Sequence, residues 1–197
     1  YYTYLLIIMT RQKKYLISPN IHNATLTQKI QGNDQDSKPI NTKVIQEGAL
    51  TIFLNNQEIV TLMCILDFPQ YLAIGYLINQ NMIKNNEKIK SIDYDEQINI
   101  IVIRTKRKTN YEQILKKKIT TSGCAQGTIF GNIYDEIEKI RIRSRIIIKH
   151  DWIYDISKKI NLTPSLYLEA GAVHGCVISE KNKPIIYMED VGRHNAV

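Results

Sequence analysis

Short runs of apolar residues, separated by polar turns, predict a mixed α/β fold. Residues 48–63 contain two β-rich runs on either side of the Asn-Asn pair at 55–56. Asparagine tolerates the left-handed backbone of a tight turn, so this stretch predicts a hairpin. Residues 98–106 predict another strand, and residues 173–179 and 184–190 predict two more around the turn EKNK.

A helical pattern follows the first hairpin. Asp67 is expected to cap a helix that has Pro69 in its first turn. The apolar stripe of this helix recurs at roughly helical spacing and comprises Leu72, Tyr76, Leu77 and Ile83. Further helices are expected at residues 110–118, 132–139 and 151–160, and GRHNAV at the end reads as a loop that enters a helix.

These patterns divide the chain into three parts. Residues 1–42 are expected to be a disordered or mobile lead-in, because the stretch from Gln12 onward is polar and irregular. Residues 43–118 predict a β-rich portion with one helix. Residues 119–197 predict the start of an α/β domain.

Composition places the chain among globular proteins. Of its 197 residues, 44% are hydrophobic and 23% are charged, which argues against disorder of the whole chain. The net charge of +7, from 26 Lys and Arg against 19 Asp and Glu, favours anionic partners. Compositional drift toward Ile, Lys, Asn and Tyr would give the same surplus, so the charge alone identifies no partner.

The cysteines indicate a reducing compartment. Three cysteines, an odd number, argue against a disulfide-stapled secreted domain and favour the cytoplasm. The apolar run at residues 1–9 is shorter than the roughly 20 residues that a membrane-spanning helix needs. It also lacks the basic leader and the cleavage site of a signal peptide. A cytoplasmic protein without a membrane anchor is therefore expected.

The segment TTSGCAQGT, at residues 120–128, carries the first candidate for chemistry. Gly123 and Gly127 let the backbone turn sharply and leave the Cys124 thiol uncovered. The thiolate is the reactive form of cysteine, and neighbouring N–H groups and positive charge favour it. Cys124 is therefore a candidate nucleophile with Ser122, Gly123 and Gly127 as its supporting loop. A bystander cysteine in a surface loop is the alternative.

The other two cysteines contrast with Cys124. Cys64 follows Leu62 and Met63 in a predicted strand, and Cys176 lies among the apolar residues of another. Free cysteine is usually buried as a small hydrophobe. Both are therefore expected in or near the core.

Two further motifs lie near the end of the chain. His174 follows a turn of small residues, where its imidazole could move a proton, orient an anion or bond the backbone. EDVGRHNA presents Arg193 and His194 where a helix begins, and helix N-termini and arginine both bind anions. Phosphate contacts are one reading, and a turn in which Glu189 or Asp190 pairs with Arg193 is the other.

Together these three segments resemble the formate dehydrogenase accessory protein family, the FdhD sulfur carriers. The family's cysteine loop TSxCxxC, histidine turn TGGxHAA and string EDVGRHNAxDK correspond here to TSGCAQG, AGAVHGC and EDVGRHNAV, in the same order. The likeness covers about residues 44–197, and EDVGRHNA is its most specific part.

The resemblance implies a cytidine-deaminase-like fold, a three-layer α/β/α sandwich that is incomplete here, with an N-terminal β-rich portion. It also implies a sulfurtransferase with a persulfide intermediate on Cys124. A cysteine desulfurase would load this thiol by thiol exchange. The sulfur would then pass to the molybdenum (or tungsten) bis-molybdopterin guanine dinucleotide of formate dehydrogenase.

The resemblance further implies the partners of the chain. The molybdenum cofactor would bind transiently, with His174, Arg193 and His194 as possible contacts, and no metal or cofactor would be bound permanently. The formate dehydrogenase catalytic subunit is the expected protein partner, and nucleic acid and membrane are not expected. A homodimer is expected for the complete protein.

Departures from the family pattern leave two alternatives open. Gly127 stands where many members carry a second cysteine, so a dithiol relay cannot operate and a non-catalytic cofactor-binding chaperone is the first alternative. A zinc deaminase, the second, needs His-x-Glu and Pro-Cys-x-x-Cys. Here Gly175 and Cys176 follow His174, and the sequence contains no CxxC.

The family pattern also continues past the position of Val197. The resemblance therefore implies a fragment or a degenerate copy. The strands at residues 173–179 and 184–190 would then expose apolar surface and unpaired edges. Poor solubility or oligomers, and no activity as a sulfur donor, are expected of this chain, and sedimentation would check the first.

Overall fold

The computed structural model describes residues 15, 17–84, 87–106, 118–120, 128–130 and 144–197. The chain divides into two compact units. Unit 1 combines residues 1–46 with residues 146–197, and unit 2 comprises residues 47–145. This division does not coincide with the expected boundary between residues 118 and 119, which stays a prediction.

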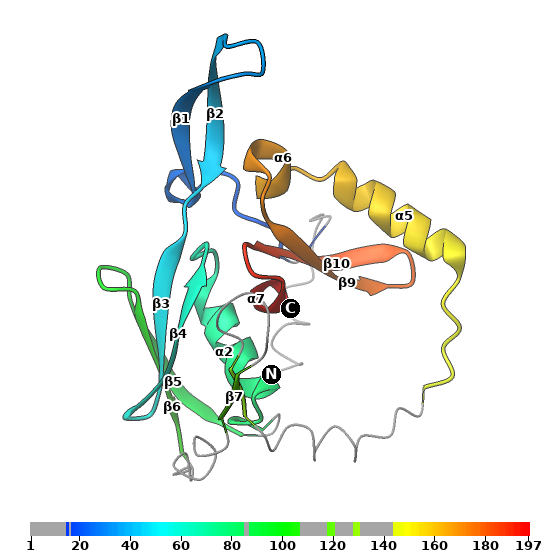
Figure 1. Ribbon diagram of the computed structural model, residues 1–197. Helices are drawn as coiled ribbons and strands as arrows, with labels where there is room; N and C mark the ends of the chain where they lie inside the picture. Colours follow the sequence, from blue (N-terminus) through cyan, green and yellow to red (C-terminus); the bar gives the residue numbers. More distant parts are fainter. Residues whose placement is uncertain (1–14, 16, 85–86, 107–117, 121–127, 131–143) are drawn as a thin grey trace. The chain divides into compact units, whose positions relative to one another are not determined.

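Unit 2 is built on a four-stranded sheet with the order β4-β3-β6-β5 (Figure 1). β3 (Gly48–Leu54) and β4 (Gln57–Cys64) form the predicted hairpin, and Asn55 at its turn has the left-handed φ of 55° that the prediction required. β6 (Ile100–Thr105) pairs with β3 in parallel and with β5 (Ile89–Asp95) in antiparallel orientation. The strand expected at residues 98–106 is thus confirmed, whereas β5 was not predicted.

The core of unit 2 lies between one face of this sheet and α2 (Pro69–Asn79). Alternate residues of β3 are buried, because successive residues of a strand point to opposite faces. Ala73 and Leu77 of α2 are fully buried in the same cluster. Cys64 is buried there too, as predicted. The buried members are Leu50, Ile52, Leu54, Ile59, Leu62, Cys64, Ala73, Leu77, Met82, Ile83, Ile101 and Ile103.

The start of α2 differs from the prediction. Its N-cap residue is Phe68, which has a left-handed φ of 51° and makes no side-chain capping bond. The prediction that Asp67 caps this helix is therefore wrong, because the turn at Phe68 separates Asp67 from the first helical residue. Pro69 does lie in the first turn. Ile83 reaches the core from the segment that follows the helix.

Unit 1 begins with a β-ribbon in the region expected to lack structure. After the 3-10 turn η1 (Ala24–Leu26), β1 (Thr27–Asn33) and β2 (Pro39–Ile45) pair in antiparallel orientation over their full length. The prediction of a disordered lead-in is thus wrong for this stretch. Most residues of the two strands are exposed and none is buried, so the sequence of the ribbon shows no apolar alternation.

Local hydrogen bonds close the turn of this ribbon and an ion pair holds its base. The Asp34 carboxylate accepts the backbone N–H groups of Asp36 and Lys38, both at 2.9 Å. At the other end of β2, the Lys43 ammonium lies 2.5 Å from the Glu169 carboxylate on α6 (Leu166–Ala170). Hydrogen bonds and an ion pair therefore stabilise this ribbon, whereas a buried hairpin is stabilised by packing of an apolar face.

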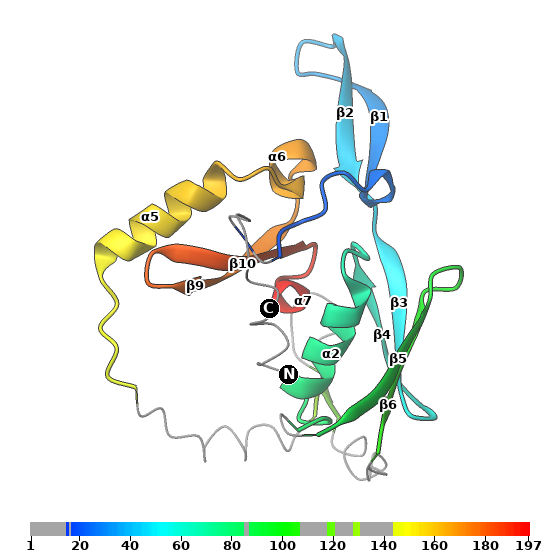
Figure 2. The same cartoon turned by 180° about the vertical axis from the view of Figure 1, so that it is seen from behind.

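The remainder of unit 1 is an antiparallel hairpin with a long helix beside it (Figure 2). α5 (His150–Asn161) confirms the helix expected at residues 151–160, and β9 (His174–Glu180) and β10 (Lys183–Asp190) confirm the two strands. α5 is bonded to the hairpin turn, since Asn182 accepts a bond from Lys159 through its carbonyl and donates one to Asp155. α6 was not predicted.

The mixture of sheets and helices in the two units confirms the α/β class, and the three-layer deaminase-like arrangement stays a prediction. The helices expected at residues 110–118 and 132–139 lie outside the described residues, except Lys118, which begins the strand β7 (Lys118–Thr120). Within the described ranges, no helix has both the length and the apolar character needed to cross a bilayer.

Tyr76 on α2 provides a test of the packing of unit 2. Its hydroxyl is buried and has no hydrogen-bond partner among the described residues, and burial raises the pKa of Tyr76 to about 12. An unpaired buried hydroxyl costs about 1–3 kcal/mol. Tyr76→Phe should therefore raise the free energy of unfolding near neutral pH by about 1 kcal/mol, measured by urea denaturation with circular dichroism.

The same substitution should alter the dependence of stability on pH. The folded state holds the phenolic proton of Tyr76 more tightly than the unfolded state, in which the pKa of Tyr76 is 10.0. This difference in proton affinity stabilises the fold fully below pH 10, and the stabilisation is lost as pH rises toward about 12. Tyr76→Phe should remove the part of the fall in the free energy of unfolding at alkaline pH that comes from Tyr76. The control is Tyr71→Phe, because Tyr71 lies on the same helix and is 52% exposed. A less stable Tyr76→Phe variant would contradict the assignment.

Candidate functional site

The cysteine loop cannot be placed geometrically, because Ser122, Gly123, Cys124 and Gly127 lie outside the described residues. The strands on either side of this loop are described. β7 pairs in antiparallel orientation with β8 (Thr128–Phe130), and Thr120 lies opposite Thr128. The chain therefore enters and leaves the segment 121–127 at directly opposed positions. The roles of these four residues stay predictions.

The other candidate residues lie on the β9–β10 hairpin and on α7 (Arg193–Ala196), which follows it. The register sets His174 opposite Asp190, Gly175 opposite Glu189, and Cys176 opposite Met188. Because side chains alternate along a strand, the hairpin has two distinct faces. One carries His174, Cys176, Met188 and Asp190 and is called the site face. The other carries Gly175, Val177, Tyr187 and Glu189 and is called the anchor face.

The site face is where α7 turns back onto the hairpin. The Asp190 carboxylate accepts the Gly192 N–H and the Asn195 side-chain amide, both at 2.9 Å. A Cβ at Gly192 would lie 3.0 Å from the Asn195 amide nitrogen, so a side chain there would crowd this turn. Asp190 thereby holds the start of α7 over the face that carries His174.

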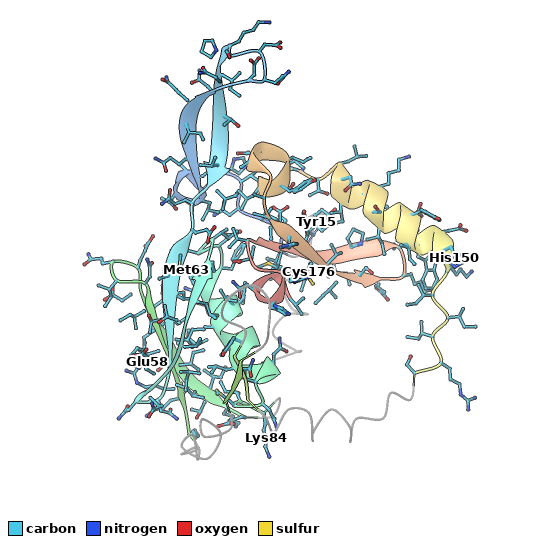
Figure 3. All side chains as sticks on the ribbon, in the orientation of Figure 1. Tyr15, Glu58, Met63, Lys84, His150 and Cys176 are labelled. Atoms are coloured by element: carbon cyan, nitrogen blue, oxygen red, sulfur yellow. The ribbon has the colours of Figure 1, made fainter. Side chains whose placement is uncertain are left out.

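This arrangement places the three predicted anion contacts at one end of the hairpin. His174 is exposed at the start of β9, and Arg193 and His194 are exposed on α7, which packs against both strands. An arginine and two imidazoles at one end of a hairpin present several N–H donors to an anion. Cys176 is a half-buried free thiol on the same face, two residues beyond His174, consistent with its expected near-core position (Figure 3).

The alternative turn with an ion-paired Arg193 does not match the described contacts. Within the described part of the chain, Arg193 forms no ion pair with Glu189 or Asp190, whose side chains are engaged elsewhere. Both carboxylates are buried, whereas the Arg193 side chain is exposed. The two acidic residues of EDVGRHNA are therefore buried in hydrogen bonds, whereas its Arg193 and His194 are exposed.

The anchor face holds a network that the sequence did not reveal. The Glu189 carboxylate accepts the Leu166 N–H at 2.7 Å and the Tyr187 hydroxyl at 2.5 Å. Burial, together with the hydrogen bond and the charge of Glu189, raises the pKa of Tyr187. The sequence signal for this network was the alternation of β10, which sets Tyr187 and Glu189 on one face.

Gly175 completes the anchor face. A Cβ at this position would lie 2.9 Å from a ring carbon of Tyr187, closer than real side chains approach. The glycine therefore lets the Tyr187 ring lie across the strand and bring its hydroxyl to Glu189.

The described residues suggest no metal centre. In the ranges given above, no group of three or more His, Cys, Asp and Glu side chains is arranged to hold a metal ion. The site face thus carries the exposed His174 and the half-buried Cys176 thiol, and the exposed Arg193 and His194 follow on α7.

Comparison with known proteins gives a consistent result. Residues 45–197 match the model of the FdhD/NarQ family. Sulfur carrier protein FdhD of Bacillus pumilus is 28% identical over 156 residues, which cover 79% of this chain and 60% of that protein. The proteins of the same name from Wolinella succinogenes and Bacillus subtilis are each 25% identical, and the chain covers 54% and 61% of their lengths. The chain thus spans less than two thirds of these relatives.

A solved structure shares the fold. The crystal structure described as a formate dehydrogenase accessory protein from Desulfotalea psychrophila superposes with a TM-score of 0.59. The match covers 86% of this chain and 63% of that one, at 20% identity. At this identity the likeness establishes the fold.

The crowding at Gly175 can be measured. Gly175→Ala should displace the Tyr187 ring and lower the free energy of unfolding of unit 1 by about 1–3 kcal/mol, as overpacking does. Trp152, the single tryptophan, lies on α5 and reports on unit 1 by fluorescence during urea unfolding. Gly32→Ala on β1 is the matched control, because no heavy atom lies within 4 Å of its added Cβ. Equal stability of the two variants would refute the close contact.

Proposed function

The chain belongs to the FdhD/NarQ family, and on this premise we propose that it carries sulfur for the maturation of formate dehydrogenase. The observation that carries the proposal is the family match over residues 45–197, which includes the cysteine loop, the histidine turn and EDVGRHNA. The names of the relatives, sulfur carrier protein FdhD, support the same role. The exposed His174, Arg193 and His194 add a binding surface for an anionic cargo.

The proposed chemistry begins at Cys124. Its thiolate attacks the outer sulfur of a persulfide on a cysteine desulfurase. The donor's S–S bond breaks, a new S–S bond forms on Cys124, and the donor cysteine leaves as a thiolate. The step needs no oxidant, because sulfane sulfur only exchanges one thiolate partner for another. Ser122, Gly123 and Gly127 flank Cys124 in the sequence and are the residues we propose to present its thiol.

The second proposed step passes this sulfur to the molybdenum (or tungsten) bis-molybdopterin guanine dinucleotide, which is the substrate that receives it. The S–S bond on Cys124 breaks, the Cys124 thiolate is the leaving group, and the reduced metal of the substrate would supply the two electrons that the sulfane sulfur gains. The phosphates of this molecule suit Arg193, which offers a charged fork of donors. His174 and His194 add further donors on the same end of the hairpin. The formate dehydrogenase catalytic subunit then takes the sulfurated cofactor.

A cofactor-binding chaperone is the second candidate, and the glycine at position 127 favours it. Without a second cysteine in this loop, the chain cannot exchange sulfur through a local dithiol. Such a chaperone would use the anion contacts of the site face and leave Cys124 unmodified. Loading of Cys124 therefore distinguishes the two functions.

The sulfur carrier proposal predicts that Cys124 alone holds a persulfide. After incubation with a cysteine desulfurase and cysteine, intact-mass measurement should show the addition of one sulfur. Cys124→Ala should abolish the addition, because the other cysteines are buried or half-buried in β4 and β9. Cys64→Ala and Cys176→Ala are the controls and should load normally. Unchanged loading of Cys124→Ala would exclude this role for Cys124.

The anion contacts predict a second result. Guanosine diphosphate, as a probe of the cofactor's nucleotide end, should bind the chain, and Arg193→Ala should weaken binding by about 1.5–3 kcal/mol, as expected for a charge-assisted contact. Isothermal calorimetry would measure the loss.

The matched control is Lys183→Ala. Lys183 is an exposed cation on the same hairpin, at the turn end of β10. This variant should bind like the unmodified chain. Equal affinity of the Arg193→Ala variant, shown to be folded, would assign Arg193 to another role.

A further inference from the structure

The buried carboxylate of Glu189 belongs to unit 1 and has no role in the function proposed above. Its residue is 3% exposed. One oxygen accepts the Leu166 N–H at 2.7 Å, and the other accepts the Tyr187 hydroxyl at 2.5 Å and the Tyr167 N–H at a longer 3.4 Å. A buried carboxylate is tolerated only where such donors replace water. No cation is paired with it among the described residues.

These bonds fix the start of α6 to the end of β10. Ser165, the N-cap residue, accepts the Leu168 N–H, so side-chain oxygens satisfy the free N–H groups of the first turn. Glu189 supplies a link that is not local, because it lies 23 positions along the chain from Leu166. Together with the Lys43–Glu169 ion pair, this link fixes the position of α6.

The chain then runs directly from α6 to His174. Gly171 and Ala172 have φ values of 67° and 57°, and Val173 is buried, so the connection is short and sharply bent. His174 lies opposite Asp190, the residue next to Glu189, and Asp190 holds the start of α7. Glu189 is thus connected to His174 through α6, and to the start of α7 through the adjacent Asp190 on β10.

We propose that Glu189 is a positioning residue: held by Tyr187 and the α6 N–H groups on the anchor face, it fixes His174 and the α7 cations on the site face. It acts through the backbone and does not touch the anion, because the two faces are opposite. The anion-binding role of the site face rests on the proposed function. The anchoring of that face by Glu189 does not.

Cys176 offers a direct readout of this anchoring. Its half-buried thiol lies on the site face, whereas Cys64 is buried in unit 2. Alkylation of the native chain with iodoacetamide, followed by peptide mass mapping, gives a separate rate for each cysteine. Glu189→Gln keeps the size of the side chain and loses the charge. It should accelerate alkylation of Cys176 about tenfold through local opening and leave Cys64 unchanged.

Two further variants make the test specific. Tyr187→Phe removes one hydrogen-bond donor and keeps the Glu189 carboxylate, so it should accelerate alkylation of Cys176 by a smaller factor than Glu189→Gln does. Glu180→Gln, at the exposed turn end of β9, is the matched control and should change neither rate. Equal acceleration of Cys64 and Cys176, or no acceleration of either in both anchor variants, would overturn the anchoring.

Inorganic pyrophosphate then tests the link to the site. Glu189→Gln should weaken pyrophosphate binding several-fold although the carboxylate lies on the opposite face, and Glu180→Gln should not. Faster alkylation of Cys176 with unchanged pyrophosphate affinity would overturn the positioning role. Failure of Cys124 to load with sulfur would count against the sulfur carrier function alone, since neither alkylation nor pyrophosphate binding requires it.

Discussion

The register between β9 and β10 is the constraint on which the rest of unit 1 depends. In an antiparallel pair, a slip by one residue reverses the face of every side chain. Such a slip would turn Glu189 away from α6, and it would turn Asp190, together with the start of α7 that it bonds, away from the face that carries His174. The irregularity in this pair lies between Pro184 and Ile186, near the hairpin turn, so the register is regular where the two carboxylates act.

The same register explains why EDVGRHNA combines opposite kinds of residue. Its two acids are buried and hold backbone N–H groups, a hydroxyl or an amide, which replace the water they lose. Its arginine and histidine are exposed. In this chain the string EDVGRHNA thus contains a buried acidic part, which fixes two connections, and an exposed basic part.

Sequence reasoning succeeded where one face of an element is buried. β3 and β4 of unit 2 alternate clearly, and their hairpin was predicted with its turn. β1, β2 and β5 escaped notice because none of their residues is fully buried, so their apolar residues follow no simple period. α6 escaped because it is short and its stabilising bond comes from a distant strand.

The roles predicted for the candidate site residues stay predictions. His174, Arg193 and His194 were identified by residue type, and the structure brings them to one end of the hairpin. Glu189 and Tyr187 could not be assigned, because their role depends on contacts with α6 that no local pattern encodes. The predicted roles of Cys124 and its loop rest on the sequence, since they lie outside the described residues.

The division of the chain has a consequence for biosynthesis. Unit 1 is discontinuous, because its two segments flank the whole of unit 2. During translation the β1–β2 ribbon leaves the ribosome long before Glu169, its ion-pair partner on α6, is made. Unit 2 is continuous and can fold first, which shortens the effective loop that unit 1 must close. The ribbon thus waits for its ion-pair partner while 126 further residues are made, and it is exposed to chaperones and proteases over that time.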